Sequence, residues 1–377
     1  MTYELQNNLQ TFEENTFILS ADTYKRLNQK TQVITDSKSY AVRTRLTHSL
    51  EVASIGSYIS EILNNKLGFQ LVNPNVVANV GHIHDIGHSP LGHVGALILN
   101  NELNKNGLNF EDNANSLTIL EKYYPNMSDV VLLSSIKYPF LIGENKLYPE
   151  KGLYKNQKHY IEELNELCNK QAEFIGTDII AKRTFESYIM EFADDISYLT
   201  GDLEDFILHF DGKIPELYLR HLFDVYDPEK KLDEEFEILL DINKKNANFN
   251  IWTLRKYMIR NVTFDKVKNE FYFEDNKFYD LEKILRKLTF DLYIDKFSIR
   301  PEDKLATKFR NYISYLYENL ENDKIITKQL NSRRYKKLYL STSDLNDRAK
   351  ILSQAISEFT DKHLLKNLKK YSKKDNN

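Results

Sequence analysis

Apolar residues recur at intervals of three and four along most of the chain, which is the period of one buried face of an α-helix. One such face consists of Val52, Ile55, Ile59 and Leu63, on a helix that we expect to begin near Thr47. Alternating, strand-like stretches are scarce, and only 12 Gly and 8 Pro interrupt the 377 residues. The pattern predicts an all-α fold.

Two further helices are indicated by a start signal or by an apolar stripe. Asn73-Pro74 is typical of a helix N-cap followed by proline at the first helical position, and apolar residues follow it at helical spacing. A longer helix is predicted from about Thr184 to His209, and its continuous stripe consists of Ile189, Phe192, Ile196, Leu199, Leu203 and Phe206. We expect this helix to be central and closely packed.

The stretch YPFLIGENKLYPEKGLYKNQ, around residues 138–157, has no clear periodicity and predicts a long, lid-like surface loop. Amphipathic helices resume from about Lys213. We therefore expect residues 1–210 to form the core that carries the site, and residues 211–377 to complete the same globule. Residues 370–377 are predicted to be a disordered tail, because they contain almost no apolar side chain.

Charge, cysteine content and missing motifs argue against several classes of protein. The chain has 51 Lys and Arg against 55 Asp and Glu, a net charge of −4, which argues against a surface that coats nucleic acid. The single cysteine, Cys168, excludes a disulfide framework. Phosphate-loop and serine-hydrolase motifs are absent from the sequence. No apolar run is long enough for a membrane span and no secretory signal opens the chain, so we expect a soluble, cytoplasmic protein without a membrane partner.

Histidine is unevenly distributed. Four of the nine histidines fall in one twelve-residue window, where chance would place about 0.3. They are His82, His84, His88 and His93. The same window and its edges hold four of the 12 glycines, Gly81, Gly87, Gly92 and Gly95. Such a concentration predicts a functional site.

Candidate metal ligands occur in three separate segments. They are His48 in RTRLTHSLEVA, His84 and Asp85 in HIHDIGHSPLGH, and Asp194 in EFADDISY. Any one of them alone is more often a hydrogen-bonded structural residue, but the combination is more specific. Imidazole and carboxylate without thiolate suit one divalent ion such as Mn, Mg, Fe, Co, Ni or Zn.

The order H…HD…D within these strings resembles the HD-domain phosphohydrolases, and the deoxyguanosine triphosphate triphosphohydrolase (dGTPase) family in particular. The similarity begins near KRLNQKTQV, continues through LTIL, IKYP and ADDISYLTGDLEDF, and reaches SEFTDKH. It implies an HD-domain helical bundle with additional C-terminal helices packed on it. It also implies one divalent metal held by His48, His84, Asp85 and Asp194, and hydrolysis of a deoxynucleoside triphosphate to deoxynucleoside and inorganic triphosphate.

The resemblance implies further roles for residues of the same strings. His88 and His93 would face the phosphates as catalytic residues, with His93 passing a proton to the leaving 5′-oxygen; the alternative for His88 is support of the metal. Asp195 would not be a ligand, and His82 would be structural. The implied substrate-binding residues are Gln32, Arg45, Lys137, Tyr138, Tyr198 and Asp202.

Helical spacing supports the placement of three of these site residues near one another. Asp194, Tyr198 and Asp202 follow one another at intervals of four, so they share one face of the predicted 184–209 helix. The alternative for Asp202 is an ordinary solvated helix charge.

The chain also departs from the family pattern. Ala96 stands three residues after His93, where the family has an acidic residue, Thr118 stands in place of an arginine, and the N-terminal arginine-rich segment is reduced to TYKRL. Three functions stay open: a hydrolase of dGTP or of deoxynucleoside triphosphates more broadly, a catalytically impaired nucleotide-binding regulator, and an HD phosphohydrolase acting on another nucleotide. The resemblance further implies a homo-oligomer, and leaves open a nucleotide or single-stranded DNA effector.

Overall fold

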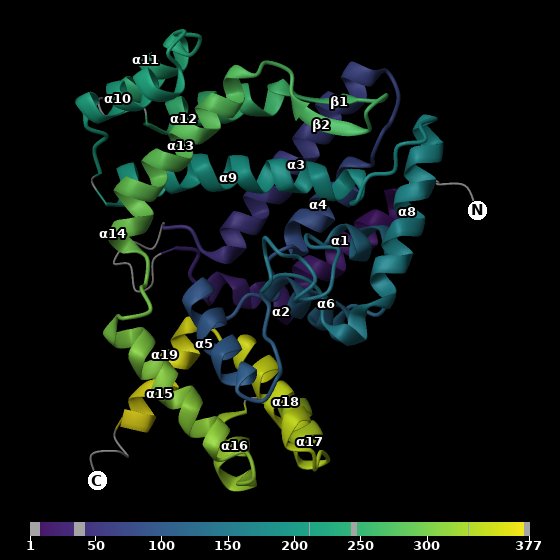
Figure 1. Ribbon diagram of the computed structural model, residues 1–377, viewed down its shortest axis with the longest axis vertical. Helices are drawn as coiled ribbons and strands as arrows, with labels where there is room; N and C mark the ends of the chain where they lie inside the picture. Colours follow the sequence, from purple (N-terminus) through teal and green to yellow (C-terminus); the bar gives the residue numbers. More distant parts are fainter. Residues whose placement is uncertain (1–7, 34–41, 211, 243–246, 331, 373–377) are drawn as a thin grey trace.

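The structure is a computed structural model that describes residues 8–33, 42–210, 212–242, 247–330 and 332–372. Helices make up nearly all of its regular structure (Figure 1). The all-α expectation is therefore confirmed. None of the helices in these ranges is long and apolar enough to cross a membrane.

Three helices form the centre of the upper part of the molecule. They are α3 (Arg45–Leu67), α4 (Pro74–Ile83) and α9 (Phe185–His209), which pack on one another. Each begins at a side chain that accepts a hydrogen bond from the backbone, namely Thr44, Asn73 and Thr184. The predicted start of α4 and both ends of α9 are thus confirmed, and α3 begins two residues before Thr47.

More helices enclose these three and share their apolar core. On the N-terminal side they are α1 (Asn8–Ser20), α2 (Asp22–Lys25) and the 3-10 turn Arg26–Gln29. Across α9 lie α10 (Glu216–Tyr226), α11 (Asp233–Ile242), α12 (Ala247–Asn261) and α13 (Lys277–Thr289) (Figure 1). A π-helical stretch, Phe290–Ile294, and α14 (Asp295–Phe297) lead downward from α13.

A short β-hairpin interrupts the region after Lys213, where only helices were predicted. Strands β1 (Val262–Asp265) and β2 (Glu270–Phe273) pair antiparallel, with Val262 opposite Phe273 and Phe264 opposite Phe271. These four apolar side chains are buried. The rings of Phe264 and Phe271 both lie edge-on to Phe185, and they are tilted relative to each other. The alternation of buried and partly exposed positions is the strand signal, but four residues are too few to distinguish it from a loop.

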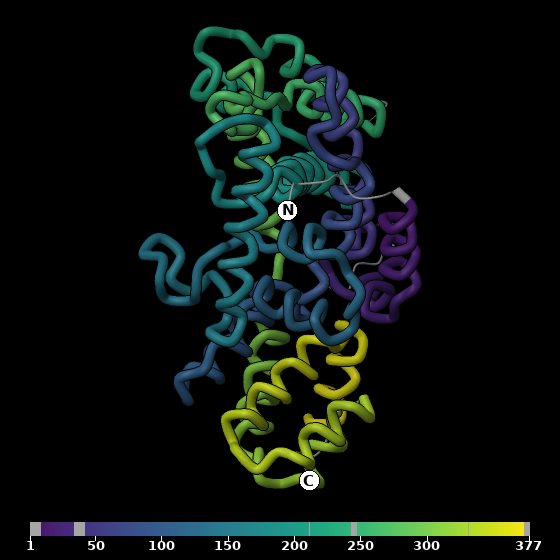
Figure 2. The backbone as a smooth tube through the Cα atoms, turned by 90° about the vertical axis from the view of Figure 1, so that its right-hand side faces the viewer, coloured from purple at the N-terminus to yellow at the C-terminus, as the bar shows by residue number. Residues whose placement is uncertain are grey.

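A second apolar core lies in the lower part of the molecule, where the C-terminal helices pack around α5 (Gly92–Asn104) (Figures 1 and 2). These helices are α15 (Lys304–Glu318), α16 (Asp323–Gln329), α17 (Arg333–Leu340), α18 (Leu345–Ser357) and α19 (Asp361–Ser372). A smaller cluster joins α6 (Asp112–Tyr123), α7 (Asp129–Ser134) and α8 (His159–Ile175). The histidine-rich segment therefore connects the upper core to the lower one.

The predicted loop is present, and the predicted tail is wrong in part. No helix or strand occurs from Tyr138 to Tyr154, and the 3-10 turn Lys155–Gln157 follows. At the C-terminus α19 continues to Ser372, and the ring of Tyr371 packs 5.2 Å from that of Tyr315. Residues 370–372 are therefore helical because one aromatic side chain finds a partner on α15, while residues 373–377 lie outside the described residues.

Candidate metal centre and adjoining cavity

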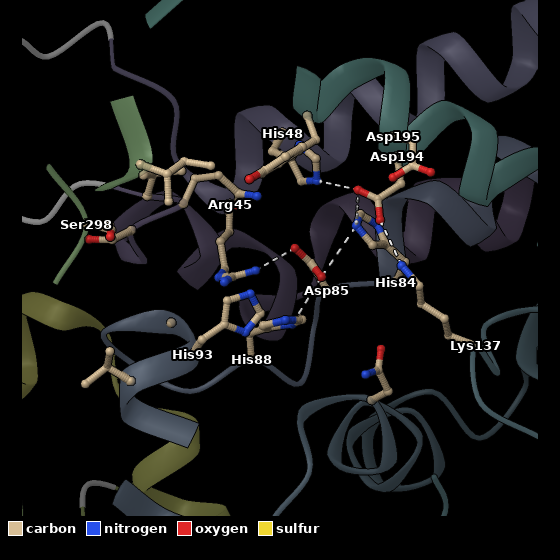
Figure 3. Close-up of a pocket in the computed structure, with 18 of the residues that line it drawn as sticks. Arg45, His48, His84, Asp85, His88, His93, Lys137, Asp194, Asp195 and Ser298 are labelled. Carbon is tan, nitrogen blue, oxygen red and sulfur yellow. Dashed lines mark hydrogen bonds and ion pairs between the residues drawn. The ribbon is translucent and has the colours of Figure 1, made fainter. Parts of the chain in front are cut away.

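Three side chains from separate helices converge on one point (Figure 3). His48 lies in the first turn of α3, His84 directly follows α4, and Asp194 lies in the middle of α9. One possible ligand atom of each lies within 4.8 Å of the others. Nε2 of His48 is 3.1 Å from Oδ1 of Asp194, and Nε2 of His84 is 3.8 Å from the same oxygen. Two imidazoles and a carboxylate so arranged can hold a divalent ion.

Hydrogen bonds on the far side of each ring determine which nitrogen is left for a ligand. Nδ1 of His84 lies 2.7 Å from the carbonyl oxygen of Gly81, so this nitrogen carries the proton. Nε2 of His84, the other nitrogen of the ring, is buried and without a hydrogen-bond partner among the described residues, so it is the atom placed to bind a cation. Nδ1 of His48 lies 3.3 Å from Oγ of Ser197, whose own proton goes to Glu51 at 2.9 Å. Nε2 of both rings faces the carboxylate of Asp194, and a cation bound there would take the place of the hydrogen-bonded proton between His48 and Asp194.

Asp85, the fourth predicted ligand, lies beside this trio. Its Oδ1 is 3.5 Å from Nε2 of His84 and 3.1 Å from Nδ1 of His88, and its Oδ2 accepts a hydrogen bond from Arg45 at 2.6 Å. Burial disfavours its charge, but His88, His84 and Arg45 together hold the pKa of Asp85 well below its usual range. The carboxylate is therefore ionised and within reach of an ion bound to His84.

The trio opens onto a cavity of about 440 Å³, a size typical of small-molecule sites. All but one of the residues predicted from the sequence line it. They are Gln32, Arg45, His48, His84, Asp85, His88, His93, Lys137, Tyr138, Asp194 and Tyr198. The exception is Asp202.

Asp202 lies behind the cavity, in a buried ion-pair network. It is fully buried and forms a hydrogen-bonded ion pair with Arg43. The same guanidinium lies 3.3 Å from a carboxylate oxygen of Asp205 and 3.3 Å from one of Glu51. The helical spacing placed Asp202 on the correct face of α9, but it could not reveal that Arg43 occupies that part of the face.

Four cationic side chains line the cavity: Arg45, Lys137, Lys151 and Arg286. Nζ of Lys137 lies 3.3 Å from Oδ2 of Asp194. Although burial opposes its charge, Asp194 raises the pKa of Lys137 above the usual value for lysine, so this side chain is charged at neutral pH.

Sequence reasoning missed Lys151, Arg286 and Ser298 as cavity residues. Lys151 had one weak signal, because it belongs to the predicted 138–157 loop. Arg286 lies in α13 and pairs with Asp195 at 3.3 Å, so the carboxylate next to Asp194 also borders the cavity. Ser298 follows α14, and no motif surrounds it or Arg286.

His88 and His93 lie side by side at the cavity wall, with ring centroids 6.0 Å apart (Figure 3). Burial and the charge of Arg45 lower both pKa values, that of His93 to about 4 and that of His88 well below the usual range. Behind them lies Asp112, the first residue of α6, which is buried and has Oδ2 3.8 Å from Nε2 of His88. Burial, with Glu111 nearby, raises the pKa of Asp112 to about 7.

Three other residues of the sequence argument do not line the cavity. His82 is buried with Nδ1 2.8 Å from the hydroxyl of Tyr24, which fits its predicted structural role. Ala96 packs against the second apolar core. Thr118 donates to the carbonyl of Ala114 and accepts from the amide of Gln157 at 3.2 Å. The side chains of Ala96 and Thr118, the two departures from the family pattern, thus contact residues around the site and do not line the cavity.

Comparison with known proteins agrees with this geometry. Residues 45–132 match the HD domain family. A relative from Rickettsia akari, a deoxyguanosinetriphosphate triphosphohydrolase-like protein, is 29% identical over 287 residues, which cover 69% of this chain and 68% of the relative. Proteins of the same description from Shewanella pealeana and Vibrio campbellii are 34% and 31% identical. Those two alignments span about half the length of each relative, 51% and 52%.

A helical bundle in which His48, His84 and Asp194 meet beside Asp85 defines an HD-domain protein. The relatives reported above are all dGTPase-like proteins, which this chain resembles over up to 69% of its length.

Proposed function

We propose that this chain hydrolyses deoxynucleoside triphosphates, dGTP or a broader set, to the deoxynucleoside and inorganic triphosphate with the help of a divalent metal ion. The observation that carries the proposal is the unpartnered, buried Nε2 of His84, which faces two carboxylates at the edge of a cavity lined by four cations. The names of the relatives, deoxyguanosinetriphosphate triphosphohydrolase-like proteins, support the same substrate class.

His48, His84, Asp85 and Asp194 would hold the metal, which could be Mn, Mg, Fe, Co, Ni or Zn. When bound, such an ion polarises a phosphoryl oxygen and lowers the pKa of a coordinated water. Lys137 now pairs with Asp194, and a cation on that carboxylate would release the lysine toward a substrate phosphate.

The cationic side chains are placed to bind the triphosphate. Arg45 donates to Asp85 and lines the cavity (Figure 3), and Lys151 lines it from the 138–154 loop. In a partly desolvated cavity these charges stabilise the negative charge that develops as the bond from the α-phosphorus to the 5′-oxygen breaks.

The remaining predicted residues suit the sugar and the proton transfer. Gln32 has a buried side-chain oxygen without a hydrogen-bond partner, which can accept from a sugar hydroxyl. Tyr138 and Tyr198 offer aromatic faces in the same cavity. His93 is neutral in the free cavity, and a bound triphosphate would raise its pKa, so it can take up a proton and pass it to the 5′-oxygen.

The test incubates the purified full chain with each deoxynucleoside triphosphate and Mn²⁺ or Mg²⁺, and separates the products by ion-pair chromatography. We expect deoxynucleoside and triphosphate in equal amounts, and much less product from the matching ribonucleotide. Asp194→Asn should lose both bound metal and activity. Asp195→Asn, which removes the adjacent carboxylate, should keep its metal and serves as the control.

Two results would contradict this function and select an alternative. Failure to release triphosphate from any substrate, alone or in mixtures, with calorimetric nucleotide binding retained, would indicate the impaired regulator that Ala96 suggests. Nucleoside monophosphate or free phosphate as product would indicate an HD phosphohydrolase acting on another nucleotide. The same preparation tests the homo-oligomer and the nucleotide or single-stranded DNA effector, which stay predictions, as does the cytoplasmic location.

A further inference from the structure

A second group of metal-ligating side chains lies next to the first and is not used by the centre described above. His88, His93 and Asp112 each offer one ligand atom, and the three atoms lie within 4.8 Å of one another. They come from three places: the loop after α4, the first turn of α5 and the first residue of α6. Three independent elements thus bring two imidazoles and a carboxylate to one point.

The carboxylate of Asp112 has no cationic partner. Its Oδ1 accepts a hydrogen bond from the backbone N–H of Ser89 at 3.1 Å, and the side chain is buried. Within the described ranges of the chain, no lysine or arginine forms an ion pair with it. The neighbouring Glu111 differs, because Lys151 pairs with it at 3.2 Å. A buried carboxylate without a counter-charge is costly, and a bound cation is one way to compensate it.

The imidazole that faces this carboxylate makes no hydrogen bond to it. Nε2 of His88 is 3.8 Å from Oδ2 of Asp112, which is longer than a hydrogen bond and is a separation that an ion between the two atoms can bridge. Nδ1 of the same ring lies 3.1 Å from Oδ1 of Asp85. A carboxylate behind a ligating imidazole is the usual arrangement around protein-bound metals.

We propose that His88, His93 and Asp112 form a second site for a divalent transition-metal ion, separated by Asp85 from the centre at His48, His84 and Asp194. Figure 3 shows Asp85 between His84 and His88, at the junction of the two groups. Two nitrogens and one carboxylate oxygen suit ions such as Zn²⁺, Co²⁺ and Mn²⁺ better than Ca²⁺. The open face of the site is the cavity, where His93 is exposed.

The test of this inference measures metal alone, so its outcome is distinguishable from that of the proposed function, in which the metal-free imidazole of His93 carries the proton. The chelator-treated full chain is dialysed against Zn²⁺ or Mn²⁺ up to millimolar free ion, and bound metal per chain is measured by elemental analysis. We expect two equivalents in the unaltered chain and one in Asp112→Asn, which keeps an oxygen to accept from Ser89 but loses the charge. Asp194→Asn should also hold one equivalent, at the other position.

The matched control is Glu111→Gln, which removes the adjacent buried carboxylate and should still bind two equivalents. Circular dichroism checks that every variant is folded. Should Asp112→Asn unfold, His93→Gln replaces it, since that side chain is exposed and its loss leaves the packing intact. One equivalent in the unaltered chain, or two in a folded Asp112→Asn or His93→Gln variant, would overturn the proposal.

Discussion

The imidazole of His84 donates to the carbonyl oxygen of Gly81, 2.7 Å away and one turn earlier in α4. This bond fixes the ring so that Nε2 faces Asp194 and Asp85. At Gly81 the backbones of α4 and α3 also lie close together, since a Cβ added to Gly81 would lie 2.8 Å from the backbone of Ala53. The position of the metal ligand is therefore tied to a close contact between two helix backbones.

We expect Gly81→Ala to weaken both the fold and the metal site. The added methyl group forces the helices apart, which costs about 1–3 kcal/mol, and it displaces the carbonyl that orients His84, which costs roughly ten- to a hundredfold in metal affinity. Urea unfolding and titration with Mn²⁺ measure the two effects. Gly176→Ala is the control: it strains a left-handed backbone at the end of α8, with open space around it, and should lower stability alone. Unchanged metal affinity in Gly81→Ala would contradict this coupling.

A second prediction concerns the network behind His48. Arg43 contacts Asp202, Asp205 and Glu51, and the serine that bonds His48 also bonds Glu51. Asp202→Asn removes one of three carboxylates around Arg43 and leaves Asp205 and Glu51 in place, so it should lower the free energy of unfolding by about 1.5–3 kcal/mol, the contribution of a hydrogen bond to a charged group. If Asp202 instead binds substrate, as the family resemblance implies, Asp202→Asn should raise KM and leave the free energy of unfolding unchanged.

A double-mutant cycle distinguishes these two roles. If Asp202 acts through Arg43, the variants Asp202→Asn and Arg43→Met will be non-additive, with a coupling of about 0.5–3 kcal/mol measured in urea. Additive effects, or an Asp202→Asn variant as stable as the unaltered chain, would instead support a substrate-binding role for Asp202. The matched control is Tyr198→Phe, on the same helix face and facing the cavity, which should leave stability almost unchanged.

How much the sequence could predict depends on the range of the interactions. The helices with clear caps were predicted nearly to the residue, because Asn73 and Thr184 bond to backbone atoms within three positions. The convergence of the candidate metal ligands His48, His84 and Asp194 could be expected because the strings around them resemble those of one family. The position of Arg286 at the cavity could not be predicted, because it depends on the packing of α13 on α9. The ion pair of Asp202 and the ring contact of Tyr371 could not be predicted for the same reason: their partners, Arg43 and Tyr315, are distant in sequence.

The C-terminal helices also secure the histidine-rich loop. Asp361, the first residue of α19, accepts from the N–H of Leu91 at 2.9 Å and from the N–H of Thr31 at 2.8 Å. Leu91 has a left-handed backbone, with φ of 63°, directly before the helix that carries His93. Without this acceptor the strained turn would relax.

We therefore expect Asp361→Ala to reduce catalytic efficiency about tenfold and to lower the free energy of unfolding by about 1–3 kcal/mol, because it leaves buried N–H groups unpaired. The comparison variant is Asp344→Ala, which removes the exposed N-cap of α18 and should lower stability by about 0.5–2 kcal/mol while leaving the kinetics unchanged. Equal kinetic losses in the two variants would show that general destabilisation, and not the turn at Leu91, is responsible.

The last prediction is a pH dependence at the junction of α6 with the C-terminal helices. Nζ of Lys122 lies over the ring of Tyr335 and 3.5 Å from Glu358. Burial, with Arg334 nearby, lowers the pKa of Lys122 to about 8, although Glu358 opposes the shift. Because the unfolded chain holds this proton up to its ordinary pKa of about 10.4, the unfolded state binds more protons between those two values, and stability contributed by this site rises with pH. Relative to Lys122→Met, the unaltered chain should therefore gain stability in urea as the pH is raised from about 7 to about 10, while other titrating groups cancel in the difference. A difference that is constant with pH, or that falls, would show that Lys122 stays fully charged in the folded protein.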